Sequence, residues 1–314
     1  MQKVTIKKTD LTVSALCMGG CPLGGYGWGD IQRNDLINAV KTAVDNGINF
    51  FDTADTYGLG ESERTLAEAL GADSKNVVIT TKFGVRVENG KTTYDNSREY
   101  IFKAVEGSLQ RLKRDYIDLY QVHYRDGVTP LADVAESLEI LRQQGKIRYY
   151  GLSNIHEKDA EELKAFGNKN PFVSFQDEYS LACRKNEAEM FRFRDEYAMT
   201  PFTWGSLGQG ILSGKYDKNC KFEANDRRSR DIYVNFHGEK LLKNLEIVEV
   251  LKEIATEQGK SVASVAIRWI LDYLNDSVVI VGAKSPKQVL QNAEALDWML
   301  TQEQIDRLEK ISKE

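Results

Sequence analysis

The sequence has 314 residues, of which 41% are hydrophobic and 28% are charged, and its net charge is −5 at pH 7. This length suits two ordinary domains or one large α/β barrel, and the composition is typical of neither a disordered chain nor a disulfide-rich scaffold. The acidic surplus argues against a protein that binds nucleic acid mainly through its phosphates.

Four cysteines, Cys17, Cys21, Cys183 and Cys220, form no Cys-x-x-Cys pair, and the sequence holds only three histidines. We interpret the cysteines as reduced thiols and predict no metal site. The N-terminal residues alternate in polarity, unlike a signal peptide, and no stretch approaches the ~18 apolar residues that a membrane helix needs. The sequence therefore predicts a cytoplasmic protein without a nucleic-acid or membrane partner, and it leaves the oligomeric state open.

The first predicted element is a β-hairpin, formed by residues 4–6 and 11–13 around a turn at residues 8–10. Seven short apolar runs rich in β-branched and aromatic residues follow, and such runs are typical of buried parallel strands. In chain order these predicted strands span residues 48–53, 77–82, 117–123, 147–153, 172–176, 200–204 and 278–282. We expect an eighth strand between residues 205 and 240.

Segments with a helical spacing of apolar residues lie between these strands. They span residues 36–44, 101–112, 131–141, 241–251 and 261–273. Ser97 is the expected N-cap of the second helix, and a C-terminal helical tail begins with a capping box formed by Thr301 and Gln304. Alternating strands and helices without a linker favour one α/β domain over residues 1–314. The predicted fold is a (β/α)8 TIM barrel whose bottom is plugged by the hairpin, in preference to a doubly wound sheet.

Polar residues collect where the predicted strands end, and barrels of this type carry their chemistry there. Asp52, Lys82 and His123 each end a strand, and Tyr57 lies on the loop after the first of these strands. A buried Lys82 needs a carboxylate, which Asp52 can supply, and its ammonium would lower the pKa of a nearby Tyr57 hydroxyl. Tyr57 would then donate and accept a proton while His123 orients a carbonyl oxygen. A purely structural ion pair is the alternative.

Four further strand ends carry Ser153, Asn154, Gln176 and Trp204. Amide and hydroxyl groups suit a carboxamide, and a flat aromatic ring suits stacking on a nicotinamide. Hydrogen bonds to loop backbone and core packing are the alternatives for these residues. The Gly-rich run at residues 24–29 lacks the spacing of a Rossmann phosphate loop, so a nicotinamide cofactor would lie across the barrel mouth instead.

The stretch 215–231 is densely charged. It is too long and too polar for a simple connector, and we expect it to be functional or mobile. Its basic run of Arg227, Arg228 and Arg230 is too short to bind a nucleic-acid groove and suits a single phosphate.

Seven motifs follow one another along nearly the whole chain. They are FDTADTYG (51–58), TTK (80–82), DLYQVH (118–123), GKIRYYGLSN (145–154), Q-x-x-YSL (176–181), W-x-SLGQGILSGKY (204–216) and VGAKSPKQVLQNAEAL (281–296). As a set they resemble the aldo-keto reductase family, in a bacterial-type branch closer to the potassium-channel β subunits than to the aldose reductases. Residues 11–20 match less closely.

The resemblance implies a reductase of aldehydes or ketones in which Tyr57 is the general acid, Lys82 and Asp52 tune it, and His123 positions the carbonyl. It implies NADP(H) as the cofactor, with NAD(H) as an alternative because Gln288 stands where many members carry Arg. The implied cofactor contacts are Ser153, Asn154, Gln176, Trp204, Ser206, Leu207, Gly208, Gly210, Lys215, Arg228, Gly282, Lys284, Gln288, Gln291 and Asn292.

Two functions of different class stay open on the sequence. One is a carbonyl reductase, and the other is a cofactor-loaded regulatory or binding subunit with little turnover. The complete set of Asp, Tyr, Lys and His favours the enzyme. Variable loops after the strands would shape the pocket for a small carbonyl substrate, and the candidate residues are Tyr26, Trp28, Arg125 and Phe236.

Overall fold

Eight parallel strands close into a barrel in the order β10-β11-β12-β3-β4-β5-β8-β9, and β9 pairs with β10 to complete the circle. The structure is a computed structural model that describes residues 1–313, with residues 157 and 158 described by their backbone alone. The strands are β3 (Leu16–Gly19), β4 (Phe50–Asp52), β5 (Val78–Phe83), β8 (Ile117–Val122), β9 (Ile147–Ser153), β10 (Ser174–Glu178), β11 (Thr200–Trp204) and β12 (Val278–Gly282). The predicted (β/α)8 barrel is therefore confirmed.

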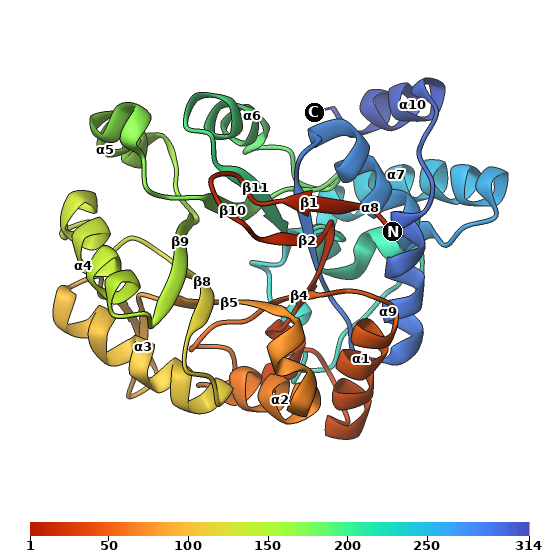
Figure 1. The fold of residues 1–314 in the computed structure, drawn as a ribbon. Helices are drawn as coiled ribbons and strands as arrows, with labels where there is room; N and C mark the ends of the chain where they lie inside the picture. The colour runs from red at the N-terminus through yellow and green to blue at the C-terminus, as the bar shows by residue number, and fades with distance from the viewer. Residues whose placement is uncertain (314) are drawn as a thin grey trace.

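Helices surround the barrel on its outside (Figure 1). They are α1 (Arg33–Asp45), α2 (Glu61–Leu70), α3 (Arg98–Leu112), α4 (Leu131–Gln143), α5 (Glu157–Phe166), α6 (Glu187–Glu196), α7 (Gly238–Gln258), α8 (Val262–Leu274), α9 (Pro286–Ala293) and α10 (Gln302–Ser312). The apolar spacing explains how they pack, since in α1 the buried residues Leu36, Ala39, Val40 and Ala43 recur on one face. Helices α2, α5, α6 and α9 were not placed by the sequence analysis.

Two predicted helix starts are confirmed by their hydrogen bonds. The Ser97 hydroxyl accepts the Tyr100 N–H at 3.3 Å and caps α3. In α10 the Thr301 hydroxyl accepts the Gln304 N–H, while the Gln304 side chain accepts the Thr301 N–H at 3.1 Å. Each cap satisfies amide groups that the first helical turn leaves without a partner.

The predicted N-terminal hairpin consists of β1 (Lys3–Thr5) and β2 (Thr12–Ser14), paired antiparallel. It lies across the barrel in Figure 1, over the ends where the barrel strands begin. The Lys7 amide donates to Thr200 Oγ1 at 2.8 Å, the Ser14 amide donates to Asn49 Oδ1 at 2.7 Å, and Lys8 Nζ donates to the Phe172 carbonyl. The hairpin therefore plugs the bottom of the barrel, as predicted.

The predicted position of the eighth strand is wrong. No strand occurs between residues 205 and 240, all of which the structure describes. That region holds the short 3₁₀ segments η4 (Gly208–Ser213), η5 (Arg227–Ser229) and η6 (Val234–Phe236). The eighth strand is β3, which comes directly after the hairpin and pairs with β12 and β4. Its sequence Leu-Cys-Met-Gly is short and contains no β-branched residue, so the pattern used for the other strands did not reveal it.

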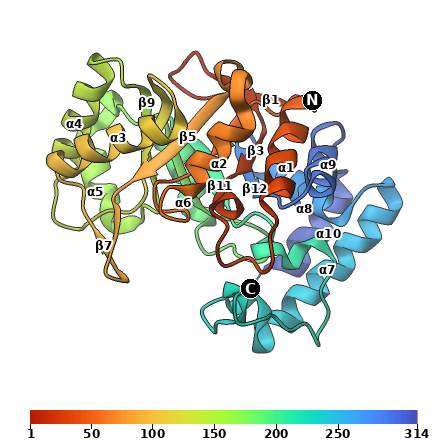
Figure 2. The same ribbon diagram turned by 90° about the horizontal axis from the view of Figure 1, so that it is seen from below.

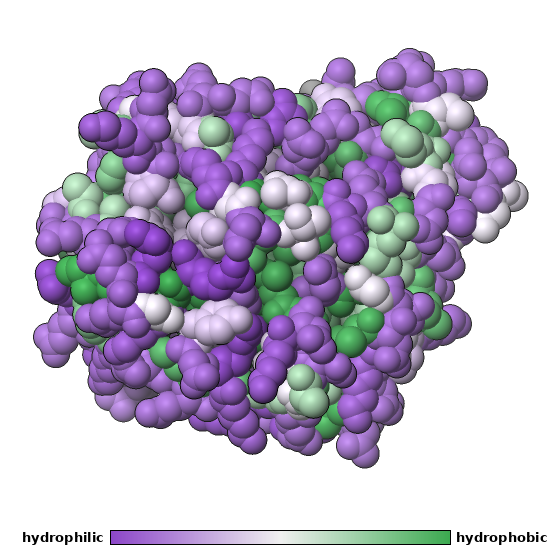
Figure 3. Space-filling view, in the orientation of Figure 1, coloured by the Kyte–Doolittle hydropathy of each residue, from purple (hydrophilic) through white to green (hydrophobic). Residues whose placement is uncertain are grey.

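A second hairpin, β6 (Val85–Glu88) paired with β7 (Lys91–Tyr94), follows β5 and was not predicted. It projects from the body of the barrel in Figure 2. The face of the molecule that carries β1 and β2 is mainly hydrophilic, with hydrophobic side chains exposed between the hydrophilic ones (Figure 3). Among residues 1–313, no helix has both the length and the apolar character required to cross a membrane.

Candidate active site

A cavity of about 1210 Å³ lies at the ends where the barrel strands finish. Its wall includes residues at or just after the ends of six strands, Gly19, Asp52, His123, Ser153, Trp204 and Gly282, and Gln176 near the end of a seventh. Because all eight strands are parallel, these residues meet at one end of the barrel, opposite the hairpin. The cavity is large enough for a dinucleotide together with a small organic molecule.

Asp52 and Lys82 form a buried ion pair at the floor of this cavity. Lys82 Nζ donates to the two Asp52 carboxylate oxygens at 2.6 and 2.8 Å and to the Thr53 carbonyl at 2.9 Å. The Lys82 side chain is fully buried. An unpaired ammonium in such a position would be very unfavourable, so Asp52 is what allows a charged Lys82 there.

Tyr57 joins this pair from the loop after β4. Lys82 Nζ lies 3.4 Å from the Tyr57 hydroxyl oxygen, the longest of the four contacts that the ammonium makes. Burial raises the pKa of Tyr57 well above its usual value, and the Asp52 carboxylate raises it further. Lys82 was expected to lower this pKa, and the structure shows the opposite direction because burial, and after it the Asp52 carboxylate, favours the neutral hydroxyl. Tyr57 therefore carries its proton at neutral pH.

His123 lies one residue after β8 and faces Tyr57. The two rings meet edge to face, with centroids 5.7 Å apart. Burial, and then the Lys82 charge, lower the pKa of His123 well below its usual value. The imidazole is therefore neutral near pH 7, and its buried Nδ1 has no hydrogen-bond partner among the residues that the structure describes. A neutral imidazole at this position can hydrogen-bond a ligand oxygen beside the Tyr57 hydroxyl.

Ser153, Asn154, Gln176 and Trp204 all line the cavity and form one network of hydrogen bonds. Trp204 Nε1 donates to Asn154 Oδ1 at 3.1 Å, and Asn154 Nδ2 donates to the His123 carbonyl at 2.9 Å. Ser153 Oγ donates to the Gln176 carbonyl, and Gln176 Nε2 donates to Asp52 Oδ1 at 2.9 Å. The hydrogen bonds at the loop ends that were the alternative for these residues are thus present, and they connect the residues to the ion pair of Asp52 and Lys82. Gln176 lies two residues inside β10 instead of at its end.

Most of the remaining predicted cofactor contacts come from the segment after β11 and from α9, and the part of the cavity that these two segments line is called its second end below. All of the remaining contacts line the cavity except Gly208, which is buried behind the wall. They are Ser206, Leu207, Gly210, Lys215, Arg228, Gly282, Lys284, Gln288, Gln291 and Asn292. At Gly210 φ is +107°, a backbone conformation that side chains other than glycine rarely adopt. The wall of the cavity therefore depends on glycine at this bend.

Three cations converge at this second end. Burial lowers the pKa of Lys284, and the neighbouring charges of Arg228 and Lys215 lower it further. Arg228 is held by Asp226, with Nη2 to Oδ2 at 2.5 Å, and by the Tyr216 hydroxyl at 2.6 Å. Lys284 Nζ donates to the Trp28 carbonyl at 2.8 Å. One carboxylate therefore faces three cations, and a bound phosphate would relieve their mutual repulsion.

Of the four residues predicted to shape the substrate pocket, one lines the cavity and three do not. Trp28 lines the cavity, whereas Tyr26 is 61% exposed and lies outside its wall. Arg125 is bound to Glu162 at 3.0 Å and to the Thr129 carbonyl. Phe236 is buried in a cluster with Tyr216 and Phe222. Arg125 therefore forms an ion pair and Phe236 packs in an aromatic cluster, and neither lines the cavity.

Several cavity residues were not found by the sequence analysis. Cys21 follows β3, the strand that was not placed, and Tyr124 directly follows His123. Burial raises the pKa of Tyr124 to about 12. Arg227 and Tyr233 come from the charged stretch and the segment after it, and only the basic run at residues 227–230 gave any signal for them. These residues reach the cavity through contacts between loops far apart in the sequence.

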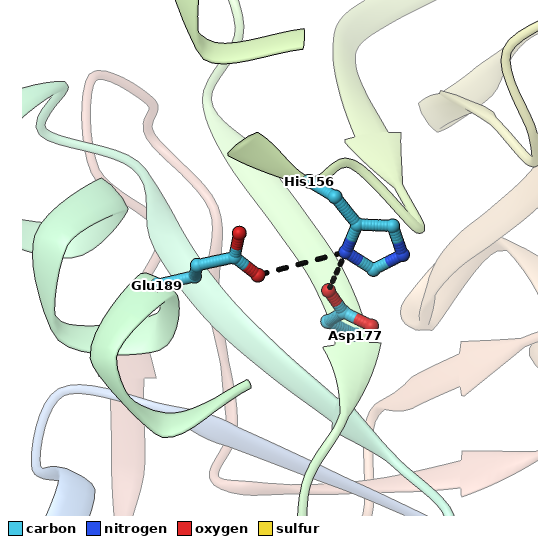
Figure 4. Close-up of side chains that lie close together, drawn as sticks. All are labelled: His156, Asp177 and Glu189. Carbon is cyan, nitrogen blue, oxygen red and sulfur yellow. Dashed lines mark ion pairs between the residues drawn. The ribbon is translucent and has the colours of Figure 1, made fainter. Parts of the chain in front are cut away.

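A separate group lies outside the cavity and contains ligand types that a metal ion could use (Figure 4). His156 Nδ1 is 3.6 Å from Asp177 Oδ2 and 3.5 Å from Glu189 Oε2. Figure 4 shows the imidazole nitrogen facing both carboxylates, and burial raises the pKa of Asp177 to about 6. None of the three side chains lines the cavity. The expectation that the chemistry in the cavity needs no metal stays a prediction.

Comparison with known proteins connects this geometry to a family. The sequence model of the "Aldo/keto reductase family" matches residues 15–313. The chain is 33% identical to the aldo-keto reductase YhdN of Bacillus subtilis, over 96% of this chain and 91% of that protein. It is 32% identical to a probable voltage-gated potassium channel subunit beta of Oryza sativa subsp. japonica, over 99% and 96%.

Solved structures agree with the sequence matches. The glycerol dehydrogenase AKR11B4 from Gluconobacter oxydans has a TM-score of 0.88 and 30% identity, covering 98% of this chain and 94% of that one. An aldo-keto reductase from Klebsiella pneumoniae in complex with NADPH has a TM-score of 0.76 and 24% identity, covering 99% and 95%. Members of the family use NADP(H). The barrel, the residues at its mouth and the match over residues 15–313 together show that the chain belongs to the aldo/keto reductase family.

Proposed function

We propose that this protein reduces aldehydes or ketones to alcohols with NADPH, and that Tyr57 donates the proton. The observation that carries the proposal is the contact chain from Asp52 through Lys82 to Tyr57, with a neutral His123 beside it at the cavity floor. A buried acid that keeps its proton at neutral pH and a neutral hydrogen-bonding ring are the two groups that a carbonyl oxygen requires when it becomes a hydroxyl.

The residues of the chain divide the work at the carbonyl oxygen. Tyr57 transfers its hydroxyl proton to that oxygen while the carbonyl carbon receives a hydride, and the products are the alcohol and the Tyr57 phenolate. Lys82 stabilises the phenolate from 3.4 Å, and Tyr57 then regains a proton from water. His123 binds the carbonyl oxygen by a hydrogen bond and fixes its position.

The cavity fits a nicotinamide dinucleotide. The bound cofactor would supply the hydride. Trp204 lines the cavity and suits stacking on its ring, and the amides of Asn154 and Gln176 and the Ser153 hydroxyl line the same cavity and suit its carboxamide. Lys215, Arg228 and Lys284 lie toward the opposite end and suit the adenosine phosphate, which is why we favour NADPH over NADH. Because Asp226 already occupies Arg228, we expect a moderate preference instead of an absolute one.

Replacing Tyr57 by Phe tests the proposal, because only the hydroxyl is removed. We expect kcat to fall by about 10²–10⁴-fold, the usual contribution of general acid catalysis, while the affinity for NADPH stays nearly unchanged. Tyr116→Phe is the matched control, because Tyr116 is a surface tyrosine that does not line the cavity. A Tyr57→Phe protein that keeps more than half of the wild-type kcat, with chemistry rate-limiting, would refute the assignment.

A second function is a cofactor-loaded regulatory subunit with little turnover, and the 32% identity to a probable channel β subunit favours it. The two functions differ in one measurable quantity, the rate at which bound NADPH is oxidised by an added carbonyl compound. Many turnovers support the enzyme, and a single slow oxidation supports the regulatory subunit. The expected cytoplasmic location stays a prediction.

A further inference from the structure

The three arginines of the basic run in the charged stretch have different surroundings. Arg228 is held by Asp226, and Arg230 is exposed at the surface, where its Nη2 donates to the Tyr26 hydroxyl at 3.2 Å. Arg227 points into the cavity wall. Among the residues that the structure describes, no carboxylate lies within ion-pair distance of its guanidinium. Arg227 is thus the member of the run that combines access to the cavity with an unpaired charge.

The neighbours of the Arg227 guanidinium are a thiol, a carbonyl and aromatic rings. Nη1 lies 3.9 Å from Cys21 Sγ, and Nη2 donates to the Tyr26 carbonyl at 3.2 Å. The guanidinium carbon is 5.1 Å from the centre of the Trp28 ring. The Tyr233 side chain also hydrogen-bonds the guanidinium. A guanidinium has five N–H donors, and none of these neighbours is a carboxylate. Arg227 therefore has the capacity to bind an anion that enters the cavity.

The position of Arg227 is fixed by contacts between two loops. Its backbone N–H donates to the Gly27 carbonyl at 3.1 Å, and Trp28 pairs with Asp226 in an isolated β-bridge. A Cβ atom at Gly27 would lie 2.6 Å from Arg227 Nε, so glycine leaves the room that the side chain occupies. In Figure 2 the segment that carries Arg227 lies at the end of the barrel opposite the N-terminal hairpin.

Arg227 belongs to the end of the cavity that holds Asp52, Tyr57 and His123, which we call the catalytic end. Its charge lowers the pKa of Tyr57 against the larger effect of burial, and Cys21, which it contacts, raises that pKa. Both residues are therefore within electrostatic reach of the acid. Cys21 begins the short segment Cys21–Gly24, and this segment packs against the Tyr57 backbone, since a Cβ atom at Gly24 would lie 2.8 Å from the Tyr57 carbonyl carbon. These contacts connect Arg227 to the part of the cavity that holds Tyr57, where the carbonyl would bind.

We propose that Arg227 forms an anion subsite for the substrate, so that the preferred substrates are aldehydes or ketones that also carry a carboxylate or a phosphate. This inference rests on the proposed carbonyl reduction and adds the substrate class. The anionic group binds the guanidinium, and the carbonyl lies between Tyr57 and His123. A charge-assisted hydrogen bond at a partly desolvated guanidinium gives a preference of roughly tenfold or more over a neutral analogue.

Two pairs of aldehydes test the subsite and separate its two possible anions. One pair is 4-formylbenzoate with its methyl ester, and the other is glyceraldehyde 3-phosphate with glyceraldehyde. We expect wild-type kcat/KM to be about tenfold or more higher for the charged member of at least one pair, and the pair that shows it identifies carboxylate or phosphate as the favoured group. Arg227→Gln should remove that preference by lowering kcat/KM for the charged member alone, and Arg227→Lys should restore part of it.

Controls keep the outcomes distinct. Arg230→Gln removes an exposed arginine of the same run and should behave as wild type. The NADPH dissociation constant, measured by fluorescence, should not change in Arg227→Gln, and a tenfold loss would mean that Arg227 serves the cofactor and would overturn the subsite. Equal losses on charged and neutral aldehydes would also overturn it.

The proposed function and the subsite can fail separately. If the wild type reduces none of the four aldehydes, the reductase proposal fails for these substrates. The subsite is then judged from binding of 4-formylbenzoate and glyceraldehyde 3-phosphate, measured by tryptophan fluorescence. Weaker binding of either compound by about tenfold in Arg227→Gln supports the subsite, and unchanged binding of both refutes it.

Discussion

The two ends of the cavity are built differently. At the catalytic end, Asp52 and Lys82 lie on barrel strands and His123 directly follows one. The ion pair is buried, with Lys82 Nζ 2.6 and 2.8 Å from the two Asp52 carboxylate oxygens. At the other end Lys215 and Arg228 come from the charged stretch 215–231, and three cations face one carboxylate.

This difference follows from the chemistry that each end would perform. A proton donor must hold its place to a fraction of an ångström, and strands of a closed barrel provide that rigidity. A phosphate-binding end requires charge more than exact placement, and loops can supply charge from several directions. We therefore expect substitutions at the catalytic end to affect both turnover and stability, and substitutions at the other end to affect mainly the affinity for the cofactor.

The largest effect is expected for Lys82→Met. It leaves the buried Asp52 carboxylate without its cation, which costs about 3–5 kcal/mol of unfolding free energy. It also removes the group that stabilises the Tyr57 phenolate, so we expect kcat to fall by about 10²-fold or more. Thermal or denaturant unfolding and steady-state kinetics measure the two effects.

The double variant Asp52→Asn with Lys82→Met is the control for this prediction. It removes both charges and should recover much of the lost stability without recovering activity. If Lys82→Met were as stable and as active as wild type, the ion pair would be neither structural nor catalytic, and the contrast between the two ends would fail.

A smaller effect is expected at the other end. Arg228→Ala and Lys284→Ala should each lower kcat/KM for NADPH by about tenfold while leaving that for NADH nearly unchanged, because only NADPH carries the adenosine phosphate. Stability should change little for Lys284→Ala, whereas Arg228→Ala also leaves Asp226 unpaired. Equal use of NADPH and NADH by wild type would show that the three cations do not form a phosphate site.

The burial of His123 predicts a pH dependence of stability. The pKa of His123 is lowered in the folded protein, so the unfolded chain binds a proton below about pH 6.5 that the folded protein does not. The free energy of unfolding therefore has its full value, as far as His123 is concerned, above about pH 6.5. It decreases as the pH falls below that value, by up to about 1.4 kcal/mol per pH unit. Unfolding measured between pH 7 and pH 5 should show a smaller decline for His123→Asn than for wild type, and identical slopes would contradict the assignment.

The smallest effect is expected from metal removal. A hydride from the cofactor supplies the reducing electrons, so exhaustive chelation should leave activity unchanged. The group of His156, Asp177 and Glu189 is where a metal ion could affect the protein, and it lies outside the cavity wall. Loss of activity on chelation, followed by its recovery on adding zinc, would overturn this prediction.

Much of the fold could be predicted because buried parallel strands are continuous apolar runs. Seven of the eight barrel strands were placed in this way, and so were the six helices of 11 or more residues, whereas the missed helices α2, α5, α6 and α9 have only 8 to 10 residues and repeat the apolar spacing over fewer turns. The short strand β3 and the weakly amphipathic α6 lack such a pattern. The hairpin β6–β7 is exposed along most of its length and carries little apolar signal.

In the candidate site, too, the residues at strand ends could be predicted from the sequence, whereas several residues on loops could not. Asp52, Lys82 and His123 could be predicted because they fall at the ends of recognisable strands. Arg125 and Phe236 were misjudged, because a sequence does not reveal that Arg125 finds Glu162 or that Phe236 packs on Tyr216. Arg227 reaches the catalytic end only because the charged stretch 215–231 contacts residues 26–28, nearly 200 residues earlier in the chain.

The most direct test of the central claim is the stoichiometry of the reaction. Purified protein is incubated with NADPH and a panel of aldehydes and ketones, and both NADPH oxidation and alcohol formation are measured over many turnovers. We expect one alcohol molecule to form for each NADPH oxidised, over many turnovers in wild type and at a rate about 10²–10⁴-fold lower in Tyr57→Phe. Tight NADPH binding without alcohol formation from any compound in the panel would contradict it.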